Sequence, residues 1–102
     1  MPDLKSDDYY EAHADFCSIC GNANRLKVLD VLKSGESYTV SELTATTGIT
    51  QSTLSQHLKL MRDRGMVSRT KEGVNNYYRI KDERIVEGML TIRQVVEEQI
   101  EE

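Results

Sequence analysis

A chain of 102 residues is long enough for one hydrophobic core and too short for two, so the sequence predicts a single domain over residues 1–102. No apolar run is long enough to span a bilayer, and the N-terminus turns acidic at Asp3, unlike a signal peptide, which predicts a cytoplasmic protein. The net charge of −4 argues against a nucleic-acid partner, yet residues 25–80 hold nine basic and five acidic side chains. The basic charge is therefore concentrated in the middle of the chain, between acidic ends.

The first predicted helix covers about residues 4–20, with acidic side chains in its first turn, where the helix dipole favours them. An apolar stripe runs along it, formed by Tyr9, Ala12, Phe16 and Ile19. Beside this stripe, at positions i, i+4 and i+7 of one helical face, are His13, Cys17 and Cys20. These three side chains are the most chemically suggestive group in the sequence.

A second helix is predicted between Gly21, which ends the first, and about Lys33, with Asn22 or Asn24 as its cap. Four of its side chains are predicted to face the core: Leu26, Val28, Leu29 and Leu32. We expect this helix to pack behind the helices that follow.

The next two helices are marked by capping residues. Thr39 and Glu42 have the spacing of a capping box, which predicts a helix to about Thr47. Gly48 then supplies a turn, and Thr50 or Ser52 caps a second helix that runs to about residue 64, before Gly65. A helix, a glycine-containing turn and a helix form the helix-turn-helix arrangement, whose second helix enters the major groove of DNA.

The helix over residues 51–64 has two unlike faces. Its apolar stripe contains Leu54, Leu58 and Met61. Its other face has hydrogen-bonding groups suited to base edges and phosphates, from Gln51, Ser52, Thr53, Ser55, Gln56 and Lys59. His57 lies in the same helix, and we predict that it packs or contacts phosphate.

Two strands are predicted over residues 66–71 and 76–80, joined by a hairpin turn at Glu72-Gly73. Near the tip lie Arg69, Lys71, Asn75 and Asn76. Such a hairpin beside a helix-turn-helix is a wing that touches the DNA backbone or minor groove. The alternative is that these four side chains are ordinary solvated turn residues.

The last predicted helix covers about residues 83–101. Its apolar side chains follow a 4, 3, 4 spacing that makes a narrow seam suited to a partner helix, namely Ile85, Met89, Ile92 and Val96. We predict that the first and last helices, at about 4–20 and 83–101, form the interface of a homodimer.

Several motifs in succession carry a resemblance: Asn22-Ala23-Asn24-Arg25-Leu26-Lys27-Val28-Leu29, Ser41-Glu42-Leu43, residues 51–59, Gly65-Met66-Val67 and Tyr77-Tyr78-Arg79-Ile80. From about Phe16 to the last helix the chain resembles the ArsR/SmtB family of winged helix-turn-helix repressors. The resemblance implies a mainly α fold with a small β-hairpin, in the order four helices, two strands and a fifth helix. It also implies a homodimer that blocks a promoter and releases it when a metal or a thiol-reactive species binds.

The metal sites of that family are not reproduced in this sequence. Family members with a site in the third helix have Cys-Val-Cys after Glu-Leu, where this chain has Thr44-Ala45-Thr46. The zinc site of the last helix retains Asp82 and Glu98, but Arg84 and Val95 replace its two histidines. Any sensing chemistry must therefore use another arrangement.

Three interpretations of Cys17 and Cys20 remain open. In the first, they are small buried hydrophobes at the edge of the core, with His13 at the surface. In the second, they are redox-active or persulfide-forming thiols, since two cysteines in a cytosolic protein favour reactivity over a structural disulfide. In the third, they act with His13 as soft ligands for a thiophilic metal or metalloid ion, although three ligands leave a tetrahedral zinc site one short.

The favoured function is a dimeric, sequence-specific repressor that binds double-stranded DNA at an inverted-repeat operator. The alternatives are a winged-helix protein-interaction module that binds no DNA, for which the acidic ends argue, and a transcription regulator with no effector. No phosphate-binding loop, serine elbow or supported Cys-His pair is present, so no enzyme is predicted.

Overall fold

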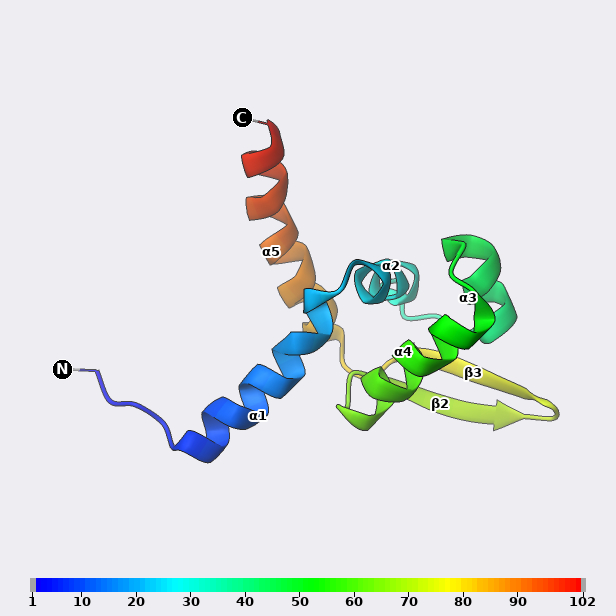
Figure 1. Cartoon of the computed structure of the whole chain (residues 1–102), viewed down its shortest axis with the longest axis horizontal. Coiled ribbons are helices and arrows are strands. Elements are labelled where there is room, and N and C mark those ends of the chain that lie inside the picture. Colours follow the sequence, from blue (N-terminus) through cyan, green and yellow to red (C-terminus); the bar gives the residue numbers. More distant parts are fainter. Residues whose placement is uncertain (1, 102) are drawn as a thin grey trace.

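The computed structural model describes residues 2–101, so the ends of the predicted domain, residues 1 and 102, lie outside it. The predicted order of helices and strands is confirmed, with one short strand and one 3₁₀ helix added (Figure 1). The elements are α1 (Asp7–Cys17), the 3₁₀ helix η1 (Ser18–Gly21), α2 (Ala23–Leu32), β1 (Tyr38–Thr39), α3 (Val40–Thr47), α4 (Gln51–Asp63), β2 (Val67–Glu72), β3 (Asn75–Ile80) and α5 (Glu83–Glu101).

Helix α1 is shorter than predicted at both ends. It begins after Ser6, whose hydroxyl accepts a hydrogen bond from the backbone N–H of Tyr9, and it gives way to η1 after Cys17. The side chain of Arg25 donates to the carbonyls of Ser18 and Ile19, which stabilises this tighter turn. Cys20 therefore lies in a 3₁₀ turn, and the prediction that it shares a continuous α-helical face with His13 is wrong.

The predicted capping residues of the central helices are confirmed. The Asn22 side chain accepts from the backbone of Arg25 at the start of α2. At the start of α3, the Thr39 hydroxyl accepts from the Glu42 N–H at 3.1 Å, and the Glu42 carboxylate accepts from the Thr39 N–H at 3.0 Å. Gly48 takes a φ of 77°, a conformation that favours glycine, and so turns the chain from α3 toward α4.

The hydrophobic core lies between α2, α3, α4 and the sheet. Its fully buried side chains include the predicted stripe of α4, namely Leu54, Leu58 and Met61. Leu26 is an exception to the predicted core, because its side chain is 37% exposed. It lies about 60° around the helix from the buried Leu29, on the flank of the buried face, and lines an apolar groove beside the terminal helices.

A three-stranded antiparallel sheet forms one side of the domain, in the order β1-β3-β2. In the hairpin Glu72 pairs with Asn75, so the turn is centred on Gly73 and Val74, one residue later than predicted. Gly73, which the prediction also placed in the turn, takes a positive φ of 61° there. Strand β1, which the sequence analysis did not identify, adds Tyr38 and Thr39 to the other edge of β3.

The two terminal helices leave the rest of the domain on the side away from the hairpin tip (Figure 1). We call residues 23–80, from α2 to β3, the winged body. The first turns of α5 place Ile85, Val86 and Met89 against the core. None of the residues of α1 and α5 that the structure describes is fully buried, so most of both helices lies outside the core.

Candidate nucleic-acid interface and the groove between the terminal helices

Helix α4 presents its polar face to solvent while its apolar stripe is fully buried. Thr53 and His57 are half-buried on the flanks of that face, and the remaining predicted contact residues are exposed, namely Gln51, Ser52, Ser55, Gln56 and Lys59. The Thr50 hydroxyl, which accepts from the backbone N–H of Thr53, fixes where the helix begins. A rigid helix therefore displays side-chain donors and acceptors in the manner required for a major groove.

Lys59 is engaged within its own helix. Its ammonium lies 3.0 Å from the Asp63 carboxylate, and both side chains are well exposed. The hydrogen bond from Lys59 lowers the pKa of Asp63. For Lys59 to bind a phosphate it must exchange this carboxylate for another anion, which an exposed pair does at little cost.

His57 is unsuited to act as a cationic phosphate ligand near neutral pH. Burial lowers the pKa of its imidazole, and the positive charge of Arg25 lowers it further. A neutral, half-buried imidazole favours the packing interpretation of this residue over the phosphate contact.

The hairpin carries its basic side chains outward. Arg69, Lys71 and Asn75 are exposed and Asn76 is half-buried, while Val74 at the tip is 95% exposed. Within residues 2–101, neither Arg69 nor Lys71 takes part in an ion pair. Both cations are therefore available for phosphate groups beside the exposed face of α4.

A second feature is a wide, mainly apolar groove of about 1340 Å³ on the side of the terminal helices. One wall comes from α1 and η1, with Phe16, Cys17 and Cys20, and the other from the seam residues of α5. The predicted seam is only partly free in the single chain, since Ile92 is 66% and Val96 is 45% exposed, whereas Ile85 and Met89 pack against the core.

Both cysteines are free and exposed in this groove, so the interpretation that they are buried core residues is wrong. Partial burial raises the pKa of the Cys20 thiol, the neighbouring Cys17 raises it further, and Arg25 acts in the opposite direction. Because the thiolate is the nucleophile, this shift makes Cys20 less reactive at neutral pH than an ordinary cysteine.

The predicted metal-binding trio is not brought together. The Tyr9 hydroxyl lies 2.9 Å from Nδ1 of His13, and no group of three His, Cys, Asp or Glu side chains among the described residues is arranged to hold a metal ion. The two cysteines and His13 line the same groove, but within the part of the chain that the structure describes they are not arranged as a three-ligand site.

Comparison with known proteins decides the family. The model for "Bacterial regulatory protein, arsR family" matches residues 22–69. The HTH-type transcriptional regulator YgaV of Escherichia coli is 31% identical over 85 residues, which make up 83% of this chain and 86% of that protein. The chain belongs to the ArsR family. Since its relatives and its fold are those of transcriptional regulators, the prediction that it is not an enzyme is confirmed.

Two further relatives define the extent of the likeness. A homodimeric winged helix-turn-helix DNA-binding domain from Mycobacterium bovis, described as a possible ArsR-family transcriptional regulator, has a TM-score of 0.82 and 28% identity, over 95% of this chain and 92% of that one. An HTH-type transcriptional regulator of Mycobacterium tuberculosis, Rv0324, is 32% identical over 79 residues. The matched region makes up 78% of this ArsR-family chain and 34% of the regulator, so the chain spans about a third of that relative's length.

One carboxylate of the zinc site that the family resemblance implies for the last helix is already paired within the chain. Arg84, which replaces a histidine, donates to both oxygens of Asp82, at 3.1 and 2.7 Å. These hydrogen bonds lower the pKa of Asp82 to about 2. The carboxylate that this site would need is therefore already occupied by a cation.

No helix within residues 2–101 has the length and apolar character to cross a membrane.

Two polar contacts at the joints of this ArsR-family chain were missed by the sequence analysis. Arg25 donates to the Ile19 carbonyl at 2.8 Å and to the Ser18 carbonyl at 3.2 Å, and so ties α2 to the turn that carries Cys20. Arg93 in α5 donates to Asp30 in α2 at 2.9 Å. No sequence signal identifies the second contact, because 63 residues separate its partners.

Proposed function

We propose that the protein is a cytoplasmic homodimeric repressor that binds an inverted-repeat operator in double-stranded DNA and is released by chemistry at Cys17 and Cys20. The observation that carries the DNA-binding part is α4, whose apolar stripe is fully buried while its polar, hydrogen-bonding face is exposed beside a basic wing. Its place in a family of helix-turn-helix transcriptional regulators supports the same reading.

The dimer is proposed to form through α1 and α5. A contiguous apolar groove of this size is uncommon on a monomeric protein and is typical of a surface that binds another chain. A second copy fits because α5 is 19 residues long and its apolar seam is narrow, as required for one helix against another. The homodimeric state of the similar domain from Mycobacterium bovis supports this arrangement.

Two-fold symmetry gives the operator its form. The two α4 helices of a dimer would enter successive major grooves about 34 Å apart, so the half-sites form an inverted repeat. The base-reading residues are proposed to be Gln51, Ser52, Thr53, Ser55 and Gln56. The phosphate-binding residues are proposed to be Lys59, Arg69 and Lys71, with Asn75 and Asn76 touching the backbone or minor groove and His57 supporting the helix from its flank.

Release is proposed to follow oxidation or persulfidation of the cysteine pair. In oxidation by a peroxide, the two thiols lose two electrons and two protons as one S–S bond forms, and the peroxide O–O bond is reduced, giving two waters from hydrogen peroxide. Both thiols line the proposed dimer seam, so a change there acts on the subunit interface. A thiophilic metal or metalloid ion would need a further ligand from the second copy, since no third ligand is grouped with the two thiols among residues 2–101.

Fluorescence anisotropy on DNA from upstream of the protein's own gene tests the proposal. The samples are reduced protein, mildly oxidised protein, and a Cys17→Ser, Cys20→Ser variant under the same oxidant. We expect tight binding by the reduced protein, loss on oxidation, and retention in the variant. Oxidation without effect refutes the thiol mechanism, and absence of binding in every form favours a protein-interaction module.

A further inference from the structure

Helix α5 is attached to the winged body at its base and at one point farther along. Its base residues Ile85, Val86 and Met89 pack on the core, whereas the large apolar side chains beyond them are exposed, from 37% for Leu90 to 78% for Ile100. The helix has 19 residues and is about 28 Å long. Packing at one end of so long a helix restricts its direction only weakly.

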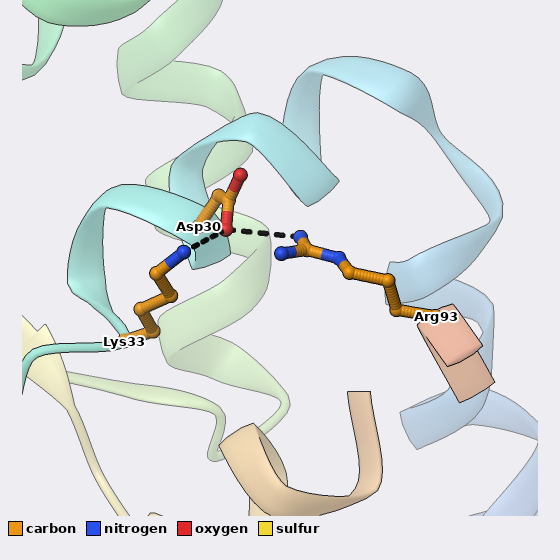
Figure 2. A network of polar contacts seen from close by, with 3 residues as sticks. All are labelled: Asp30, Lys33 and Arg93. Carbon is orange, nitrogen blue, oxygen red and sulfur yellow. Dashed lines mark hydrogen bonds and ion pairs between the residues drawn. The ribbon is translucent and has the colours of Figure 1, made fainter. Parts of the chain in front are cut away.

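The second attachment is an ion pair between α5 and α2 (Figure 2). Nη2 of Arg93 donates to Oδ1 of Asp30 at 2.9 Å, and Nζ of Lys33 donates to the same oxygen at 2.9 Å. Among the ion pairs of residues 2–101, Arg93–Asp30 is the one that joins α5 to another helix or strand. Arg93 lies ten residues beyond Glu83, about 15 Å along the helix axis.

The position and charge of the ion pair suit it to fix the angle between α5 and the winged body. The Arg93 side chain is 32% exposed and that of Asp30 is 43% exposed, so the ion pair is partly shielded from solvent. The hydrogen bond from Lys33, followed by the contacts with Arg93, lowers the pKa of Asp30, and the carboxylate stays charged at neutral pH. A charged contact far from the base of a helix opposes tilting better than one close to it, because it acts with a longer lever arm.

We propose that the Asp30–Arg93 pair sets the angle between α5 and the winged body, and through it the separation of the two α4 helices in the dimer. This inference rests on the proposed function, in which α5 lies at the two-fold axis. If the α4 helices are about 34 Å apart, each is about 17 Å from the axis, and a rotation of about 10° moves each by about 3 Å. Together these movements approach two base-pair steps of about 3.4 Å each.

The first test measures how operator binding depends on half-site spacing. Arg93→Gln and Asp30→Asn each remove the pair, and Lys33→Gln is the matched control, since it removes a cation from the same carboxylate oxygen without touching α5. Duplexes carry half-sites at the best spacing or up to two base pairs closer or farther. We expect the preference for the best spacing to fall about threefold in Arg93→Gln and in Asp30→Asn, and by no more than that when the two substitutions are combined. It should not change in Lys33→Gln.

An equal loss of affinity on every spacing, as a merely destabilised protein would give, overturns the inference. So does an equal change of spacing preference in Lys33→Gln, since the effect would then belong to the charge of Asp30 and not to α5.

The second test needs no DNA. Spin labels at Ala45→Cys in α3 and Glu98→Cys in α5, in a chain whose native cysteines are replaced by Ser, report the distance between winged body and terminal helix. Labelled chains are diluted in unlabelled protein so that each dimer carries one labelled chain. We expect a narrow distance distribution in the parent and in Lys33→Gln, and a shifted or broader one in Arg93→Gln.

Identical distributions in all three proteins overturn the role of the ion pair. If the parent binds no operator, the proposed function fails, and the distance measurement still decides whether the pair holds the angle.

Discussion

Replacing Arg25 with Ala should loosen the turn that carries Cys20. The guanidinium makes a half-buried hydrogen bond of 2.8 Å to the Ile19 carbonyl and a more exposed one of 3.2 Å to the Ser18 carbonyl. A hydrogen bond from a charged donor contributes about 1.5–3 kcal/mol when buried and less when solvent screens it. We therefore expect the free energy of unfolding to fall by about 1–2 kcal/mol, which lowers Tm by roughly 5–15 °C for a domain of this size.

Two pKa values distinguish this specific loss from general destabilisation. Arg25 opposes the larger effects that raise the pKa of the Cys20 thiol, and it adds to the burial that lowers the pKa of His57. Removing its charge should raise both pKa values. Because His57 binds its proton less readily in the folded state, it costs stability as pH falls below its ordinary pKa of about 6.5, and this cost should shrink in the variant.

The assay combines thermal unfolding with an NMR titration of His57 and the pH dependence of Cys20 alkylation in a Cys17→Ser background. The matched control is Arg25→Lys, which retains the charge but cannot reach two carbonyls with a planar fork. It should lose stability while both pKa values stay near those of the parent. An unchanged Tm in Arg25→Ala, or a fall in Tm with both pKa values unmoved, would refute the reasoning.

Three further predictions concern the reading helix, the core and the start of α5. Gln56→Ala should relax sequence preference, whereas Lys71→Ala should weaken binding on all sequences and reduce the salt slope by about 1, both measured by anisotropy at several salt concentrations; equal and uniform losses contradict this division. Leu58→Ala should cost about 2–5 kcal/mol in denaturant unfolding, since Leu58 is fully buried, and Leu26→Ala, at 37% exposure, should cost clearly less. The Asp82 carboxyl should titrate near pH 2 by NMR, and a midpoint near 4 would show that Arg84 does not stabilise this carboxylate.

The path of the central helices was predictable because its causes are local. Thr39 and Glu42 cap α3 across one turn, and Gly48 is needed where φ is positive. The stripe of Leu54, Leu58 and Met61 follows from the helical period alone. The hairpin was predicted within one residue, and the error arose because pairing of Glu72 with Asn75 decides the register, which no single residue determines.

The sequence by itself determined which face of α4 is polar, where the basic charge lies and which family the chain resembles, since these depend on residue type and on spacings of a few residues. The tertiary structure decided that Leu26 is exposed, that both cysteines lie open in the groove without His13 as a third ligand, and that α1 ends in a 3₁₀ turn. It also decided the contacts of Arg25 with that turn and of Arg93 with Asp30. Such contacts depend on where separate helices come to lie, and local patterns carry no information about that placement.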